Sequence, residues 1–416
     1  MVTGSGSTNG TVSEDQVRQY CAEAFRDMDI AGQKVLLIIP DLTRTAPIDM
    51  MFRVLYAELA DQVELLDFMI AAGTHPPLPD EDINRRVGIT ESERTTKYPK
   101  ARFFNHHWDD PAQLRVAGTI SADEIAEISG GLMAESVDVT INKLVYDYDL
   151  LLIVGPTFPH EVVGFSGGNK YLFPGIAGQE IIDLFHWLGA LITNPMIIGT
   201  KYTPVRKVVD AAAAFLPTRR MCISLVVKGN DLAGLYIGTP EEAWEAAADL
   251  SDQLHITYKS NPFTSVLSRA PEMYEDIWTG GKCMYKLEPV VADGGELIIY
   301  APHITEVSVT HGRIIEEIGY HVRDYFVEQP DRFKHIPGGV MAHSTHVKGI
   351  GTYVDGVEQP RVNVVLATGI SEELCRKINL GYRDPTTIDV NEWMNREDEG
   401  ILYVPKAGEM LYRLKN

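Results

Sequence analysis

The sequence lacks any apolar run of the roughly 18 residues that a membrane-spanning helix needs. Apolar stretches such as those at 149–156 and 294–302 are far shorter and predict buried strands. The opening ten residues, MVTGSGSTNG, have neither the basic nor the apolar region of a signal peptide. We therefore expect no membrane partner, and we expect residues 1–12 to form a disordered arm.

Cysteine is scarce, and positive charge is outweighed by negative charge. The 4 cysteines are scattered without CxxC spacing, which argues against a zinc site and a disulfide framework and favours a reducing cytoplasm. With 37 Lys and Arg against 58 Asp and Glu, the formal net charge is -21. Such a surface repels phosphate backbones, so nucleic acid is not an expected partner. Composition leaves the oligomeric state open.

The first half of the chain alternates strand and helix patterns. Continuous apolar runs predict strands at 34–40, 63–73 and 149–156, and helical spacing follows the first two at 47–59 and 80–87. This alternation is typical of a parallel α/β sheet. At roughly 150 residues per domain, 416 residues predict two or three domains.

A second set of elements follows a helical pattern at 239–255. Its members are strand-like runs, including 338–344, and helices at 313–325 and from 372 onward. The fold class predicted is α/β, with two α/β domains of mainly parallel sheets and the active site in the cleft between them. The first domain is expected to comprise 13–261 plus 399–416, and the second 262–398.

Polar side chains gather just after the predicted strands. Asp41, Thr43 and Arg44 follow the first, His75 the second and His160 the third. Ligands of parallel α/β sheets bind beyond the carboxyl ends of the strands, where two histidines can act as a pair of general bases. Arg44 could clamp a carboxylate or phosphate, or could form an ion pair with Asp41 that closes the loop.

The densest motif is the Gly-rich stretch 160–178, which contains Lys170. It fails the phosphate-loop pattern GxxxxGK[ST], because Asn169 and Tyr171 stand where Gly and Ser or Thr are required. GxGxxG fails as well, so this is no standard ATP or NAD loop. Close approach of a ligand to Gly-rich backbone and a tight irregular turn both remain open. We predict an enzyme whose active site centres on Lys170.

His186 lies in a segment with helical periodicity that begins near 179. It could be a packed core residue, or a metal ligand of the kind that nickel, copper and zinc prefer. No second metal-type ligand lies within a few residues of it, so further ligands would come from elsewhere in the fold or from a cofactor. Four other histidines receive no role: His106, His107, His343 and His346.

These segments together resemble the nickel-dependent lactate racemase family. The specific part is the block from Pro159-His160 through Gly-Phe-Ser-Gly-Gly-Asn-Lys170 to Pro-Gly-Ile-Ala-Gly178 and His186. Weaker matches are Asp41-Leu-Thr-Arg44, Ala72-Gly-Thr-His75-Pro, Asn105-His106 and Trp278-Thr-Gly-Gly-Lys282. The resemblance covers most of the chain in order.

The resemblance implies a nickel pincer nucleotide, pyridinium-3,5-bisthiocarboxylic acid mononucleotide, which holds Ni through two sulfurs and a carbon. His186 matches the protein ligand to the metal, and Lys170 matches a lysine that can attach covalently to the cofactor. Further matching positions are expected to bind the cofactor: Asp41, Thr43, Gly167 and Gly168. The first domain is therefore expected to be the cofactor-binding one.

The reaction implied is racemisation or epimerisation of a small-molecule 2-hydroxy acid by hydride transfer to and from this cofactor. His75 and His160 match the two bases that take the hydroxyl proton of either enantiomer. Arg44 and Lys282 match groups that hold the substrate and its developing charge. The alternatives are an oxidoreductase that releases the keto acid and a noncatalytic cofactor-binding protein.

The chain departs from the family pattern at positions near the substrate. Trp278-Thr279 stands where the family often has Tyr-Gln, Leu42 replaces a common histidine, and His107 replaces an aspartate. The matched bases, lysine and metal-binding histidine are retained. The departures predict a 2-hydroxy acid other than lactate, either larger or a sugar acid epimerised at C2.

Overall fold

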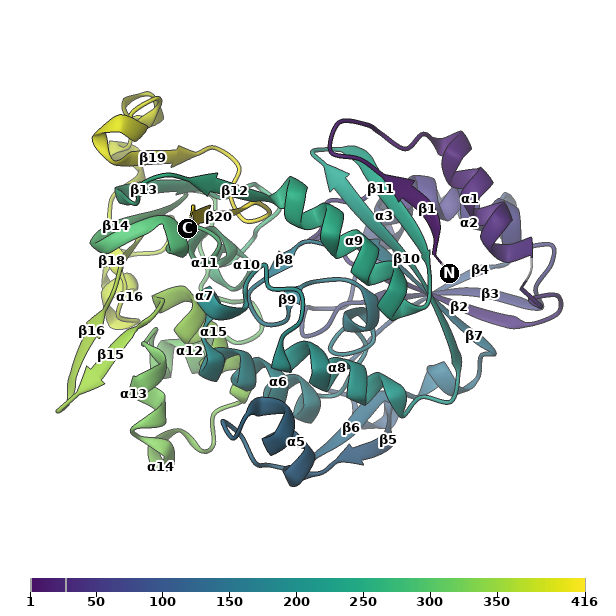
Figure 1. Ribbon diagram of the computed structural model, residues 1–416, viewed down its shortest axis with the longest axis horizontal. Helices are drawn as coiled ribbons and strands as arrows, with labels where there is room; N and C mark the ends of the chain where they lie inside the picture. Colours follow the sequence, from purple (N-terminus) through teal and green to yellow (C-terminus); the bar gives the residue numbers. More distant parts are fainter. Residues whose placement is uncertain (1, 27, 416) are drawn as a thin grey trace. The chain divides into compact units, whose positions relative to one another are not determined.

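The computed structural model describes residues 2–26 and 28–415 of the chain (Figure 1). The chain forms two compact units. Unit 1 consists of residues up to Phe158, Phe165–Ile182 and Arg206–Leu254, and unit 2 of Pro159–Gly164, Asp183–Val205 and the residues from His255 onward. The chain thus passes back and forth between the units before it completes either of them.

Unit 1 is built on a seven-stranded sheet. In sheet order its strands are β1 (Thr3–Gly6), β11 (Asp231–Gly238), β10 (Arg219–Lys228), β7 (Leu150–Pro156), β2 (Lys34–Pro40), β3 (Leu65–Ala71) and β4 (Ala101–Asn105). The five strands from β10 to β4 are parallel, whereas β11 and β1 add antiparallel pairs at one end. A mainly parallel α/β sheet is therefore confirmed.

The central strands of this sheet agree with the sequence pattern because both of their faces are buried. β2 coincides with the predicted run at 34–40, and every residue of β7 is buried. The other elements of unit 1 are α1 (Glu14–Arg26), α2 (Ile48–Leu59), α3 (Asp80–Val87), α4 (Glu91–Thr96), η1 (Pro111–Gln113), β5 (Leu114–Ile120), α5 (Ala122–Ser129), β6 (Val137–Asn142), η2 (Lys143–Tyr146) and η3 (Gly168–Tyr171). α8 (Pro204–Ala214) and α9 (Pro240–His255) also lie in it for nearly all of their length.

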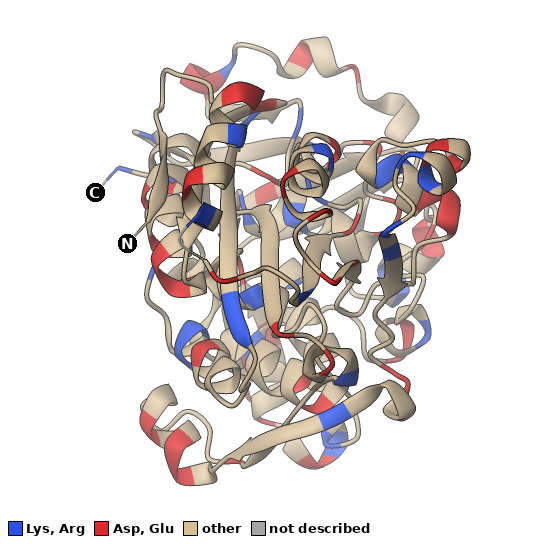
Figure 2. Cartoon of the chain, turned by 90° about the vertical axis from the view of Figure 1, so that its right-hand side faces the viewer, with Lys and Arg blue, Asp and Glu red and all other residues tan. Residues whose placement is uncertain are grey.

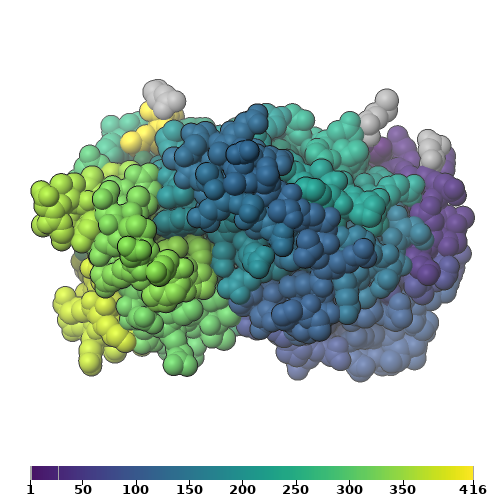
Figure 3. Space-filling view, turned by 90° about the horizontal axis from the view of Figure 1, so that it is seen from below, coloured from purple at the N-terminus to yellow at the C-terminus, as the bar shows by residue number. Residues whose placement is uncertain are grey.

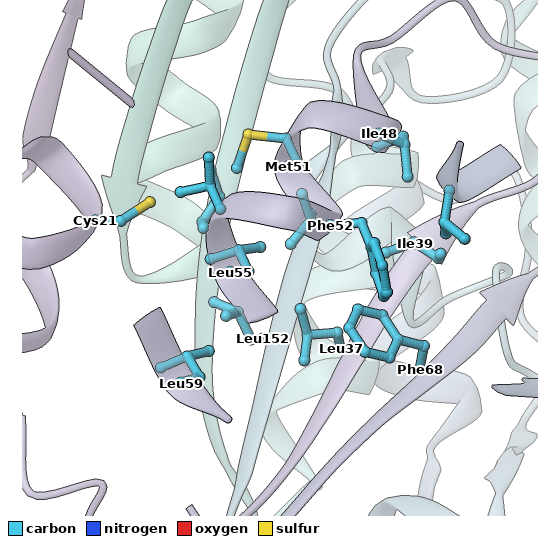
Figure 4. Packing of buried hydrophobic residues seen from close by; sticks show 14 of the residues in the cluster. Cys21, Leu37, Ile39, Ile48, Met51, Phe52, Leu55, Leu59, Phe68 and Leu152 are labelled. Atoms are coloured by element: carbon cyan, nitrogen blue, oxygen red, sulfur yellow. The ribbon is translucent and has the colours of Figure 1, made fainter. Parts of the chain in front are cut away.

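The core of unit 1 lies between the sheet and its helices. Figure 4 shows Leu37 and Ile39 of β2 and Phe68 of β3 packed against Phe52 and Leu55 of α2. Phe52 and Phe68 have ring centroids 5.1 Å apart. This packing fixes the ends of β2 and β3, from which the polar residues of the sheet edge project.

Unit 2 contains a five-stranded sheet in which every neighbouring pair is parallel. In sheet order its strands are β18 (Gly381–Tyr382), β17 (Asn363–Thr368), β14 (Val291–Ala301), β13 (Phe263–Arg269) and β19 (Ile401–Val404). Its helices include α7 (Asn194–Ile197), α10 (Ile277–Gly280), α11 (Lys282–Tyr285), α12 (Gly312–Ile318), α13 (Arg323–Val327), α14 (Pro330–Phe333), α15 (Gly338–Lys348) and α16 (Glu372–Lys377). α6 (Gln179–Ile192) belongs to unit 2 from Asp183 onward.

Smaller strands complete both units. In unit 2, β12 (Ile256–Lys259) pairs with β20 (Leu411–Leu414), and β15 (Gly351–Val354) forms a hairpin with β16 (Val357–Pro360). The segment that includes this hairpin, green to yellow-green in Figure 3, contributes a broad stretch of surface. Acidic residues recur on many helices, as Figure 2 shows. None of the described helices has the length and apolar character needed to cross a membrane.

The structure corrects several sequence predictions. Within the segment 1–12, which was expected to be a disordered arm, residues 3–6 form a strand, because β1 pairs with β11 through backbone hydrogen bonds; residue 1 lies outside the described residues. The end of the chain does not return to the first sheet, since β19 pairs with β13 in unit 2. The strand-like run at 338–344 lies in helix α15, and the single helix expected at 313–325 is two helices, α12 and α13.

Candidate active site

Asp41 and His75 meet at the carboxyl edge of the sheet of unit 1. β2 and β3 are parallel neighbours whose last residues, Pro40 and Ala71, are paired in register. The residues that follow them therefore lie side by side, and Oδ2 of Asp41 is 2.6 Å from Nδ1 of His75. The backbone N–H and hydroxyl of Thr43 donate to the other carboxylate oxygen, Oδ1, over 3.0 and 2.7 Å.

This hydrogen bonding keeps Asp41 ionised. Burial of the carboxyl group favours its neutral form, but the charge and hydrogen bond of His75, the bond from Thr43 and the charge of Arg44 outweigh burial. Together they hold the pKa of Asp41 well below its usual range. The carboxylate requires a proton on Nδ1 of His75 whether the ring is charged or neutral, so in the neutral ring Nε2 is the proton acceptor.

Two further side chains of unit 1, Arg44 and Tyr171, interact electrostatically with Asp41. Nη1 of Arg44 donates to the carbonyl oxygen of Thr43 over 3.2 Å, and its charge acts on Asp41 and Tyr171. Tyr171 directly follows Lys170, and burial raises the pKa of its hydroxyl above the usual range. Lys170 itself lies in η3, in the same unit as His75.

The glycines before Lys170 are required by the packing of the turn. Gly167 and Gly168 have φ of 91° and 59°, which L side chains rarely adopt. A Cβ on Gly167 would lie 2.5 Å from the hydroxyl of Thr157, and one on Gly168 would lie 2.9 Å from Cβ of Trp244. The tight-turn interpretation therefore explains these two positions, while their expected contact with a cofactor stays a prediction.

Arg206 of α8 fixes the backbone of this turn. Its Nη1 donates to the carbonyl oxygen of Gly167 over 3.2 Å, and its guanidinium lies 4.1 Å from the ring centre of Trp244. The indole N–H of Trp244 donates in turn to the carbonyl oxygen of Ser166 over 3.0 Å. The side-chain amide of Asn169 donates to Asp210 and Glu241 over 3.0 and 2.6 Å. The residues on both sides of Lys170 are thus anchored.

His160 and His186 lie in unit 2, not in the first domain where the sequence prediction placed them. The backbone N–H of Val162 donates to Nδ1 of His160 over 3.1 Å, closer than the carboxylate of Glu161 at 3.4 Å. With Nδ1 as acceptor, the proton of the neutral ring is on Nε2.

Lys282 is buried in unit 2, with its ammonium 4.8 Å from the ring centre of Tyr274. The ring of Trp278 lies 4.3 Å from that of His343 and 4.5 Å from that of His311. Burial and then the nearby charges of other side chains, including Lys282 and His186, lower the pKa of His343. Lys282, His186 and His343 are thus electrostatic neighbours within one unit.

The sequence reasoning gave no role to several residues of these clusters. The sequence does not predict a role for His343 or His311, because nothing near them in the chain indicates their aromatic contacts with Trp278. His106 is buried, and its Nε2 lies 2.8 Å from the carbonyl oxygen of Ala177, which indicates a structural role. The sequence does contain a signal for Arg86: it lies three residues after Ile83 on a helix, so it shares the buried face of that helix.

Within residues 2–26 and 28–415, no three His, Cys, Asp or Glu side chains gather as a metal site. A metal ion bound to this chain would therefore have to take ligands from outside such a cluster of three side chains. All four cysteines are buried and free.

The comparisons with known proteins agree with this architecture. Residues 15–196 match the family model for the lactate racemase N-terminal domain. A relative named lactate racemase from Thermoanaerobacterium thermosaccharolyticum is 23% identical over 311 residues, which are 71% of this chain and 68% of the relative. One from Lactiplantibacillus plantarum is 22% identical over 304 residues, which are 71% of this chain and 66% of the relative.

Two solved structures extend the similarity to the whole chain. A Thermotoga maritima protein superposes with a TM-score of 0.90 at 33% identity, covering 98% of this chain and 99% of that one. The lactate racemase apoprotein of T. thermosaccharolyticum superposes at 0.72 with 19% identity over 97% and 93% of the two chains, so it shares the fold. Fold and site thus define a two-unit α/β protein with a polar site beyond its parallel strands. Residues 15–196 thus match the lactate racemase N-terminal domain, and the chain as a whole is similar to proteins named lactate racemase.

Proposed function

We propose that this chain is a cytoplasmic racemase or epimerase that inverts C2 of a 2-hydroxy acid. The observation that carries the proposal is the Asp41–His75 pair, whose 2.6 Å hydrogen bond leaves Nε2 of His75 as a proton acceptor. A base of this kind is what removal of a substrate hydroxyl proton requires. The names of the curated relatives support the racemase class.

His160 is the second base of the proposed reaction, because the two enantiomers present their hydroxyl groups on opposite sides. Arg44 and Lys282 are the cations proposed to bind the substrate carboxylate and its developing charge.

The donor set suits a nickel pincer nucleotide. A cofactor that brings two sulfur ligands and one carbon ligand needs a single protein imidazole, and no larger cluster of metal-type side chains occurs in the described residues. His186 would be that ligand, and Lys170, on its anchored turn, would hold the cofactor covalently. When bound, this cofactor would accept hydride from C2 of the substrate and return it.

Intact mass and metal content of the purified protein test the cofactor. We expect a mass excess located on Lys170 together with nickel, and we expect Lys170→Arg to abolish the mass excess. Protein that racemises its substrate without nickel or added mass would contradict this part of the proposal.

A panel of chiral 2-hydroxy acids tests the reaction and its scope. Trp278 and Thr279 replace the family's common Tyr-Gln, and Trp278 is in contact with two histidine rings, so we expect activity on an acid other than lactate. Racemisation of lactate alone would contradict this scope. Release of the keto acid, with loss of a C2 deuterium label within one turnover, would favour the oxidoreductase alternative. Unchanged activity in a His75→Ala, His160→Ala double variant would contradict both assigned bases.

A further inference from the structure

Arg86 is a buried cation of unit 1 that the proposed reaction does not use. It lies in the last turn of α3, on the helix face that carries Ile83 and Val87, and only 9% of its surface is exposed. Burial of a guanidinium is unfavourable unless its five N–H donors have partners. The hydrogen-bond acceptors around Arg86 therefore indicate whether the protein alone satisfies this guanidinium or whether a bound anion is needed.

The described part of the chain satisfies little of this hydrogen-bonding capacity. Nε donates to the carbonyl oxygen of Pro40 over 3.2 Å, which places the guanidinium at the end of β2. Nη2 is buried and has no hydrogen-bond partner among residues 2–26 and 28–415. Asp41 is an electrostatic neighbour, but its carboxylate already accepts from Thr43 and His75. Buried donors left in this way are rare in native proteins.

A second cation lies at the same sheet edge. Arg44 and Arg86 both act electrostatically on Asp41 and on the hydroxyl of Tyr171, the residue after Lys170. Two guanidinium groups near one carboxylate form a cationic position in a chain whose net charge is -21. A phosphate monoester, which carries close to two negative charges, has the charge and the acceptor oxygens to accept from the unsatisfied Nη2 of Arg86.

We propose that Arg86 is an anion-binding residue, and that its guanidinium donates to the phosphate monoester of a mononucleotide held at the carboxyl edge of β2 and β3. This inference deepens the proposed function, because it rests on a mononucleotide cofactor. It adds a residue that no family motif in the sequence indicated. The competing source of an anionic oxygen is the carboxylate of the substrate.

Calorimetric titration of the full chain, purified free of cofactor, with nicotinic acid mononucleotide tests the proposal. This probe carries a pyridinium ring and a phosphate monoester, and the matching nucleoside without phosphate is the reference ligand. We expect wild type to bind the nucleotide about tenfold or more tightly than the nucleoside, and Arg86→Gln to abolish that difference. Arg53→Gln is the matched control, because Arg53 lies in neighbouring α2 in a partly exposed pair with Asp49. It should retain the phosphate preference.

Other outcomes would overturn the inference. If Arg86→Gln keeps the phosphate preference of wild type, or if wild type has none, Arg86 does not bind phosphate. If Arg86→Gln instead weakens binding of a 2-hydroxy acid to the loaded protein and leaves nucleotide binding intact, the anion is the substrate carboxylate. If Arg86→Gln fails to fold, the same titration is carried out with Arg86→Lys, which keeps the positive charge. Because the titration measures binding alone, it can succeed even if the racemase assay finds no activity.

Discussion

Asp41→Asn is the substitution that most directly tests the role given to the sheet edge of unit 1. The backbone N–H and hydroxyl of Thr43 both donate to Oδ1 of Asp41. In the variant, the amide oxygen must occupy that position, because an amide NH₂ cannot accept two hydrogen bonds. The NH₂ group then faces Nδ1 of His75, where the carboxylate Oδ2 now lies.

An NH₂ group in that position reverses the tautomer of His75. Nδ1 becomes an acceptor, the ring proton moves to Nε2, and the atom proposed to take the substrate proton is no longer basic. The hydrogen bond lost joins two groups that are charged once His75 is protonated, and such bonds contribute about 1.5–3 kcal/mol. At 1.36 kcal/mol per factor of ten, kcat is expected to fall by roughly 10- to 150-fold, before any further loss from the wrong tautomer.

Two assays measure these effects independently. Nitrogen-15 NMR of the histidine rings reports the tautomer without substrate or cofactor, and a chiral assay of the loaded enzyme reports kcat. Asp61→Asn is the control, because Asp61 is highly exposed and pairs with Lys100 at the surface. A variant that keeps the Nδ1–H tautomer of His75 and wild-type kcat would refute the reasoning.

Three further predictions concern stability and accessibility. Burial lowers the pKa of His106 to about 4 from an ordinary value of 6.5, so the unfolded chain takes up this proton first as pH falls. This group should therefore lower the free energy of unfolding by about 2 kcal/mol between pH 8 and pH 5. In urea titrations, the free energy of unfolding of His106→Gln should fall by about 2 kcal/mol less than that of wild type over the same pH range. Leu37→Ala removes a fully buried side chain from β2. It should lower the free energy of unfolding, measured by chemical denaturation, by about 2–5 kcal/mol. The control Leu132→Ala, at an exposed leucine, should cause a much smaller loss. Burial raises the pKa of the Cys21, Cys222 and Cys283 thiols to about 12, so a thiol reagent at neutral pH should label these residues only on unfolding. Rapid labelling of the native protein would contradict their burial.

The sheet core of unit 1 could be predicted because its strands have an unambiguous pattern. After Lys34, β2 is apolar throughout and buried on both faces, so its extent follows closely from composition. Gly88 ends α3 in the left-handed conformation expected of a helix-terminating glycine. The meeting of Asp41 and His75 follows from two parallel strands that end side by side.

Helix α15 could not be predicted because tertiary contacts outweigh its local propensity. It begins with Gly338 and Gly339, both poor helix formers. A Cβ on Gly338 would lie 2.6 Å from the carbonyl oxygen of Asp183, and the carboxylate of Asp183 accepts from the N–H of Gly339 over 2.9 Å. The partner that caps this helix lies more than a hundred residues earlier in the chain, so local sequence does not contain the signal.

The N-terminal strand was missed for a related reason. β1 is held by backbone pairing with β11, which makes no demand for apolar side chains. Its glycines permit close approach, since a Cβ on Gly6 would lie 2.8 Å from Cα of Gly234. A polar, Gly-rich segment of this kind has the composition of a disordered arm and the structure of a strand.

The passage of the chain between the two units also bears on how the protein folds. Unit 1 is complete only when residues 206–254 have been added, and by then residues of unit 2 have already been inserted at 159–164 and 183–205. During synthesis, the first sheet therefore lacks β10 and β11 until more than half of the chain has emerged. The exposed edge of β7 would meanwhile be open to pairing with other chains. No single cut divides the chain into its two units, so truncation at one boundary leaves both of them incomplete.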